Sequence, residues 1–134
     1  MMVTPLYAGL LAFLLLVLSI RVIRRRGSEK ISIGDGGDTS MARLIRGHAN
    51  FTEYVPLALL LMLMLEMSHF SIYVLHGLGI ALLIGRLIHG YALSFTSQFM
   101  FGRVAGAALT FFVIGIEALL CIYQAIIGHM LWVR

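Results

Sequence analysis

Four long apolar stretches occupy most of this chain and restrict its fold more than any other feature. They run approximately over residues 5–20, 41–67, 71–93 and 103–127 of a 134-residue sequence. A helix needs about 20 residues to cross the hydrocarbon core of a bilayer, so four spans with short connections nearly exhaust the length. Only 12% of the residues are charged, about half the share of a soluble domain, and the mean hydropathy is +0.98. We therefore predict an all-α integral membrane four-helix bundle with up-down topology, forming one domain over residues 1–134.

Basic residues gather at the ends of the predicted spans. Arg21, Arg24, Arg25 and Arg26 follow the first span. The positive-inside rule puts the loop that they open in the cytoplasm and both termini outside it. The net charge of +4 then indicates membrane orientation rather than nucleic-acid binding. The single cysteine, Cys121, excludes an intrachain disulfide and provides no metal cluster.

The first loop, residues 27–39, contains the sequence GDGGD from Gly34 to Asp38. Glycine at this density predicts turns with positive φ. Asp38, Thr39 or Ser40 is the expected N-cap of the second helix, since each can accept a bond from a free backbone N–H group. The loop matches neither nucleotide-binding fingerprint, so a plain connector is the expected structure.

Three residues deeper in the spans predict local features. Pro56 is expected to kink the second helix or to free a carbonyl group near Thr52. Glu66 is expected to be a solvated carboxylate at the outer interface. Glu117 lies deep in the fourth span, where an isolated carboxyl group is expected to be protonated.

The mouth of the second span carries the most informative polar pattern. At roughly 100° per residue, four polar side chains fall within about 80° of one another on one stripe of a helix. They are Arg43, Arg46, Asn50 and Glu53. Tyr54 lies at the edge of the stripe and His48 points to the far side. Polar groups in lipid cost several kcal/mol unless paired or hydrated. The stripe therefore either forms polar contacts that hold the helices of the bundle together or is a binding site.

The third span supplies a second set of polar residues. Arg86 and His89 are three residues apart and share a helical face, whereas Tyr91 faces away from Arg86 by about 140°. In an antiparallel arrangement Arg86 reaches the depth of Glu53, and an unpaired arginine there would cost about 2.5–3.5 kcal/mol. We therefore expect an Arg86–Glu53 ion pair.

Two sequence blocks resemble one known family. RLIRGHANFTEYVP, which contains Arg46, Asn50, Glu53 and Pro56, resembles the second-helix signature of the membrane-associated proteins in eicosanoid and glutathione metabolism (MAPEG). GRLIHGYAL is similar to the third-helix pattern of the same family. The resemblance covers essentially the whole chain and is nearest to the bacterial inner-membrane branch of the family.

The resemblance implies a homotrimer that binds glutathione as a co-substrate between neighbouring subunits, near the cytosolic face. It implies that Arg46, Asn50 and Glu53 hold the tripeptide, with Tyr54 and Tyr91 beside it. It also implies an arginine at the start of the fourth helix that stabilises the glutathione thiolate, for which Arg103 is the nearest candidate. The complete set of candidate binding residues is Arg43, Arg46, Asn50, Glu53, Tyr54, Arg86, His89 and Tyr91.

The ligand chemistry agrees with these residue types. Glutathione has two carboxylates that guanidinium groups can hold by bidentate contacts, and an ammonium group that suits Glu53. A lipophilic electrophile could reach the thiolate from the bilayer. The expected activity is glutathione transfer or peroxide reduction, without a metal or a protein nucleophile. The alternatives are a non-catalytic lipid-binding or structural membrane protein and, with less support, a small transporter.

Overall fold

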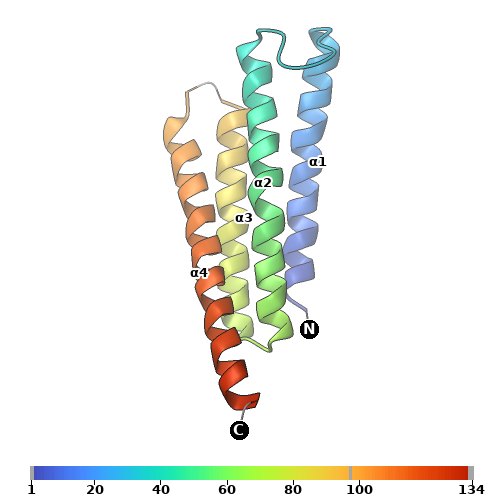
Figure 1. Ribbon diagram of the computed structural model, residues 1–134. Helices are drawn as coiled ribbons and strands as arrows, with labels where there is room; N and C mark the ends of the chain where they lie inside the picture. The colour runs from blue at the N-terminus through green and yellow to red at the C-terminus, as the bar shows by residue number, and fades with distance from the viewer. Residues whose placement is uncertain (1, 97, 133–134) are drawn as a thin grey trace.

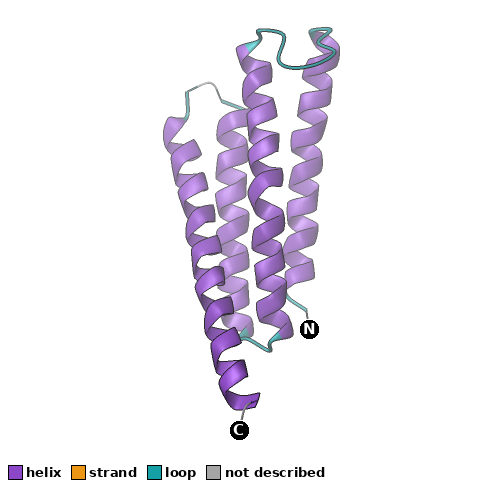
Figure 2. Cartoon of the chain, in the orientation of Figure 1, coloured by secondary structure: helices purple, strands orange, loops and turns teal. Residues whose placement is uncertain are grey.

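Four α-helices make up the bundle (Figure 1). The computed structural model describes the backbone of residues 2–96 and 98–132 and the side chains of residues 2–96 and 98–127. The helices are α1 (Thr4–Ser28), α2 (Thr39–Met67), α3 (Ile72–Ser94) and α4 (Met100–Trp132). Loops join them, and no strand occurs in the described residues (Figure 2). All four helices are long and apolar enough to cross a bilayer, which confirms the predicted fold class.

The helices run alternately up and down. The α1–α2 and α3–α4 connections therefore lie at one end, called the loop end here, and both termini lie at the other, the terminal end (Figure 1). α2 and α3 each contact every other helix. α1 and α4 lie on opposite sides of this central pair and do not touch each other within the described residues. The loop end therefore combines the ends of α1 and α3, the starts of α2 and α4, and the two loops that join them.

Apolar side chains from all four helices fill the core. Its buried members include Tyr7, Leu11, Leu18, Phe51, Val55, Met62, Leu75, Leu82 and Val113. Lipid tails are as apolar as these side chains, so close packing rather than transfer out of water holds such helices together.

The observed end of α1 and start of α2 differ in detail from the bounds that the sequence predicted. α1 continues through the arginines that begin at Arg21 and ends only at Ser28, because arginine is a good helix former outside the hydrocarbon. Asp38 is the N-cap of α2, since its carboxylate accepts from the N–H of Ser40 at 2.9 Å. The glycine loop uses positive φ as predicted, for example at Gly34 (φ +67°). α2 continues as one helix through Pro56.

Two glycines bring α3 and α4 into backbone contact. A Cβ atom added to Gly106 would lie 2.6 Å from the carbonyl oxygen of Gly85 and 2.8 Å from the backbone nitrogen of His89. Both atoms are backbone and cannot move aside cheaply. This contact lies just below the loop end and fixes the distance between the two helices there.

At the terminal end, polar groups of α1, α2 and α3 form hydrogen bonds with one another. Glu66 accepts from the backbone N–H groups of Val3 and Thr4, so it caps the start of α1 and is not the solvated carboxylate that the sequence suggested. The hydroxyl of Tyr7 lies 3.0 Å from Nδ1 of His76. Glu117 lies further along α4, between the terminal end and the loop end. It is fully buried, and neither of its oxygens has a hydrogen-bond partner among the described residues.

Candidate functional site

A cleft of about 520 Å³ opens at the loop end between α2, α3 and α4. We call it the α2–α4 cleft, and it is lined by Ala42, Arg43, Arg46, Asn50, His89, Leu93 and Arg103. Its volume falls within the roughly 300–1,000 Å³ typical of small-molecule sites. Three of the four stripe residues, Arg43, Arg46 and Asn50, line it together because positions three, four and seven apart share one helical face. His48 points away and its Nε2 lies 3.1 Å from Oγ of Ser19 on α1, as the pattern predicts.

Arg86 lies beneath this cleft and is almost completely buried, with 1% of its surface exposed. Its Nη1 donates to Oδ1 of Asn50 at 2.9 Å. Its Nη2 lies 3.5 Å from the carbonyl oxygen of Gly106. Its Nε has no partner among the described residues. A buried guanidinium is therefore held by neutral oxygens alone, which leaves its charge uncompensated near the floor of the cleft.

The expected Arg86–Glu53 ion pair is wrong. Glu53 lies instead 3.6 Å from Nη1 of Arg46, and both side chains are well exposed, at 44% and 67%. Asn50 lies one helical turn before Glu53, and its amide takes the position against Arg86 that the carboxylate was expected to hold. Glu53 remains at the exposed margin of the polar stripe.

Two candidate tyrosines do not line the cleft within one protomer. The ring of Tyr54 packs edge-on against Phe111 of α4, with 5.0 Å between ring centroids. Tyr91 is 54% exposed and stacks on Phe95 at 5.7 Å. Tyr91 faces away from Arg86, as the helical spacing predicts. The structure thus brings together part of the predicted residue set, places Arg86 beneath the cleft, and leaves Glu53, Tyr54 and Tyr91 outside its lining.

His89 and Arg103 complete the cleft on the side opposite α2. His89 is 7% exposed on α3. Arg103 is exposed in the first turn of α4, which begins at Met100, three residues earlier than the apolar pattern indicated. Arg103 therefore faces Arg43 and Arg46 across a cleft that both helices line.

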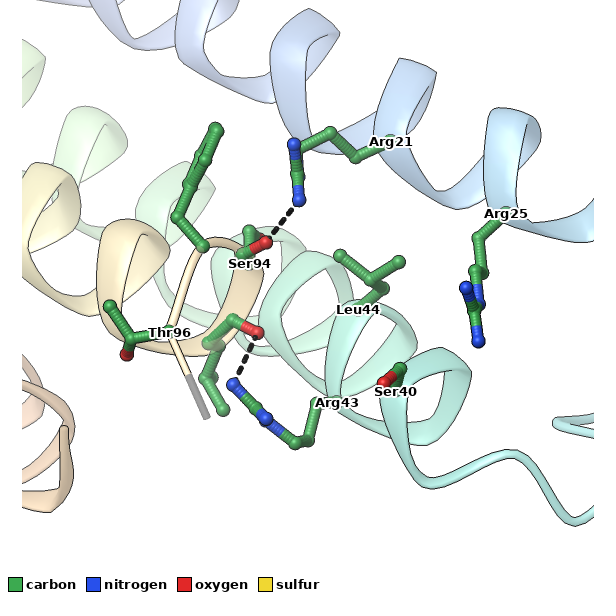
Figure 3. A pocket seen from close by; sticks show the side chains of 9 residues that line it. Arg21, Arg25, Ser40, Arg43, Leu44, Ser94 and Thr96 are labelled. Atoms are coloured by element: carbon green, nitrogen blue, oxygen red, sulfur yellow. Dashed lines mark hydrogen bonds between the residues drawn. The ribbon is translucent and has the colours of Figure 1, made fainter. Parts of the chain in front are cut away.

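A second pocket, which sequence reasoning missed, lies at the same end between α1, α2 and α3 (Figure 3). We call it the α1–α3 pocket. It measures about 380 Å³ and is lined by Arg21, Arg25, Ser40, Arg43, Leu44, Leu93, Ser94, Phe95 and Thr96. A signal was available, because Arg21 and Arg25 lie three and seven residues after the buried Leu18 and so continue the inward face of α1.

Arg25 is neutralised within this pocket. Its Nε donates to Asp38 at 2.7 Å, and its Nη1 lies 3.1 Å from Glu29. The hydrogen bond from Arg25 lowers the pKa of the Asp38 carboxyl below its ordinary value. Arg25 therefore ties the end of α1 to the N-cap of α2 and contributes little free charge.

Guanidinium groups outnumber carboxylates in and around the α2–α4 cleft. Arg43, Arg46 and Arg103 line it, and Arg86 lies beneath. Such groups bind carboxylates and phosphates through paired N–H donors. Cys121 lies in the other half of the bundle, with its Sγ 3.6 Å from the carbonyl oxygen of Leu61. The cleft is therefore suited to holding a small anion and brings no cysteine nucleophile to it.

Comparisons with known proteins agree with this arrangement. A model of the MAPEG family matches residues 4–123. The chain is 38% identical over 131 residues to inner membrane protein YecN of Escherichia coli K12, covering 98% of this chain and 95% of that protein. YecN of Escherichia coli O6:H1 matches with the same identity and coverage. Both the family match and the relatives extend over nearly the whole four-helix bundle, so the chain belongs to the MAPEG family of membrane proteins.

Proposed function

We propose that the α2–α4 cleft binds glutathione and that the protein is a membrane glutathione transferase or peroxidase acting on lipophilic electrophiles. The observation that carries this proposal is the charge of the cleft. Three arginines line a pocket of small-molecule size, with one carboxylate at its margin. Glutathione has the complementary charges: two carboxylates, one ammonium group and a thiol.

The residues of the cleft divide into binding and activating roles. Arg43 and Arg46 hold the carboxylates through bidentate contacts. Glu53 receives the ammonium group, because its contact with Arg46 is exposed and long enough to exchange at little cost. Asn50 can donate from its amide nitrogen while its oxygen accepts from Arg86. His89 forms part of the wall.

Arg103 is the candidate for thiol activation. A free thiol titrates near pH 8.5 and must ionise before it attacks. A guanidinium group beside it in a partly dehydrated cleft favours the thiolate. In transfer, the thiolate sulfur attacks an electrophilic carbon and the leaving group departs with the bonding electrons. In peroxide reduction, two glutathione molecules become one disulfide while the hydroperoxide becomes an alcohol and water.

The proposal includes a homotrimer with the loop end in the cytoplasm and both termini outside. Tyr91 and Glu53 are exposed in a single protomer, so a neighbouring subunit could cover them. Arg24 and Lys30 add to the basic charge of the loop end, in agreement with the positive-inside rule. Native mass spectrometry tests the trimer, and a monomer in mild detergent would contradict it. Reporter fusions at the termini test the orientation.

Thermal unfolding in detergent with millimolar glutathione tests binding, because a native-state ligand raises the unfolding midpoint. We expect Arg46→Ala to lose this rise while remaining folded, since Arg46 is 67% exposed. Arg24→Ala, an exposed arginine outside the cleft, is the matched control. Asn50→Ala is less informative, because it also removes the partner of Arg86. No rise with the unchanged protein would contradict glutathione binding.

Conjugation to an aryl halide then separates an enzyme from a binder. Arg103→Ala should keep the thermal response to glutathione but move the pH profile of conjugation upward. S-methylglutathione, which lacks a free thiol, should bind without reacting. Binding without turnover by the unchanged protein would contradict catalysis.

One observation favours the non-catalytic alternative. Arg86 donates to Asn50 inside a single protomer, as a purely structural contact between α2 and α3 would. That alternative predicts that anionic or apolar lipids stabilise the protein and that glutathione does not.

A further inference from the structure

The α1–α3 pocket is separate from the α2–α4 cleft, although Arg43 and Leu93 border both. Its walls come from the last turns of α1 and α3 and the first turn of α2. Two of its three guanidinium groups, those of Arg21 and Arg43, have no carboxylate partner among the described residues. Each donates to a backbone carbonyl instead.

The two carbonyls belong to adjacent residues at the end of α3. Arg21 donates through Nη2 to the carbonyl oxygen of Ser94, and Arg43 through Nη2 to that of Leu93 at 3.5 Å (Figure 3). This contact engages one of the five donors of each guanidinium and leaves the others available. The two positive charges are thereby held at two walls of one pocket, and the carboxylates of Asp38 and Glu29 do not balance them because they already pair with Arg25.

Arg21 is held in one orientation. Its guanidinium carbon lies 3.9 Å above the ring centroid of Phe95, a stacking contact that fixes the plane of the group. Its Nε and the Oγ of the buried Ser94 have no hydrogen-bond partner among the described residues. The pocket therefore combines two cations held in place with buried polar atoms that the described residues leave without a partner.

The position along the helix indicates the kind of ligand. The apolar part of α1 from Pro5 to Ile20 covers about 24 Å at 1.5 Å per residue, somewhat less than the hydrocarbon thickness of roughly 30 Å. Arg21 therefore lies close to the boundary between hydrocarbon and lipid headgroups. Val17, one helical turn before Arg21 on the same face, and Ile20 are exposed, so a ligand with acyl chains would meet apolar side chains below its headgroup.

We propose that the α1–α3 pocket binds a phosphate group through Arg21 and Arg43, and that an anionic phospholipid headgroup presents this phosphate. The planar guanidinium groups match phosphate oxygens in pairs. Negative lipid at this boundary would also neutralise charge that the bundle itself leaves uncompensated. Because Arg43 borders both sites, a lipid phosphate and glutathione would compete for its guanidinium, and the test therefore uses Arg21, which lines the α1–α3 pocket and not the α2–α4 cleft.

Thermal unfolding of delipidated protein in a neutral detergent tests the proposal with three additives: phosphatidylglycerol, phosphatidylcholine and inorganic phosphate. We expect phosphatidylglycerol to raise the midpoint by about 4 °C or more, and phosphatidylcholine to have a much smaller effect. Arg21→Gln should lose most of the rise. Arg24→Gln is the matched control, because Arg24 is exposed on the same helix and does not line the pocket.

Three results would overturn the proposal in whole or in part. Equal losses in Arg21→Gln and Arg24→Gln would mean that general surface charge attracts the lipid. No rise with phosphatidylglycerol would remove the site altogether. A full rise with inorganic phosphate alone would keep the phosphate site and overturn the lipid headgroup as its source.

A second measurement guards against a folding defect in Arg21→Gln. Native mass spectrometry counts phosphatidylglycerol retained by the folded protein only, and Arg21→Lys keeps the charge while losing the paired donors. We expect retention to decrease from the unchanged protein through Arg21→Lys to Arg21→Gln. Unchanged retention in Arg21→Gln would contradict the proposal even if that variant were less stable.

Discussion

At the terminal end, Glu66 accepts from two backbone N–H groups of α1, and Tyr7 bonds His76. At the loop end, Arg46 and Arg103 lie exposed along a cleft, while Arg86 is buried against neutral oxygens. Both ends thus carry polar side chains at the boundaries of apolar helices. At the terminal end these side chains find hydrogen-bond partners within the protomer. At the loop end several guanidinium groups have no carboxylate partner among the described residues.

The difference separates structural polarity from polarity that is available to a ligand. A carboxylate that caps a helix is already satisfied, so Glu66 offers little to a partner. A guanidinium held by one carbonyl keeps most of its donors, so Arg21 and Arg43 can still bind an anion. Residue type alone does not distinguish these cases, and the hydrogen-bond partners do.

The largest expected effect concerns the backbone contact beneath the α2–α4 cleft. Gly106→Ala should lower the free energy of unfolding by about 3 kcal/mol, because the added Cβ meets backbone atoms of Gly85 and His89 and neither helix can retreat without losing packing. Gly115→Ala, on the same helix with open space around it, should leave stability unchanged or slightly raised. Thermal or denaturant unfolding in detergent measures both. Equal effects would mean that the α3–α4 backbone contact at Gly106 does not limit stability.

The next largest effect concerns which side chain, Asn50 or Glu53, supports the buried Arg86 guanidinium. Asn50→Ala should cost about 2 kcal/mol, since it removes the side-chain acceptor of a buried guanidinium. Glu53→Gln should cost less than about 0.5 kcal/mol, because the Arg46–Glu53 pair is exposed. The same unfolding assay compares the variants. A larger cost for Glu53→Gln than for Asn50→Ala would restore the Arg86–Glu53 pair.

At the terminal end, Glu66→Ala should cost about 1 kcal/mol through loss of the cap on α1. It should not change the thermal response to glutathione or to phosphatidylglycerol, because both proposed sites lie at the loop end. Glu29→Ala, at an exposed position of the loop end, should have an effect within about 0.5 kcal/mol. A loss of either ligand response in Glu66→Ala would break the division of roles between the two ends.

The smallest effect is a pH dependence at the Arg25–Asp38 contact. The pKa of Asp38 is lowered in the folded protein, so this contact stabilises the fold fully above the ordinary pKa of the carboxyl. The stabilisation is lost as the pH falls through the lowered value. Asp38→Asn keeps an N-cap acceptor but removes the charge. Its stability should fall below that of the unchanged protein at pH 6, and the difference should vanish in acid. A difference that stays constant with pH would contradict this account.

Sequence reasoning located the spans and much of the cleft, for identifiable reasons. Helical spacing grouped Arg43, Arg46 and Asn50 on one face, and these residues do line a common cleft. The same reasoning failed for Arg86, because depth along two antiparallel helices is known only to about one turn. One turn separates Asn50 from Glu53, so the choice between an amide and a carboxylate partner was beyond its precision.

The sequence by itself determined that this chain is a four-helix membrane protein, because apolar length and the distribution of charge are properties of the chain and need no neighbours. It also determined family membership, through residues that lie close together on α2 and α3. Only the tertiary structure decided which polar groups are already satisfied. Arg21 is far in sequence from Ser94 and Phe95, and it meets them in one pocket because α1 and α3 pack side by side, a relation that depends on helix rotation and depth rather than on local pattern.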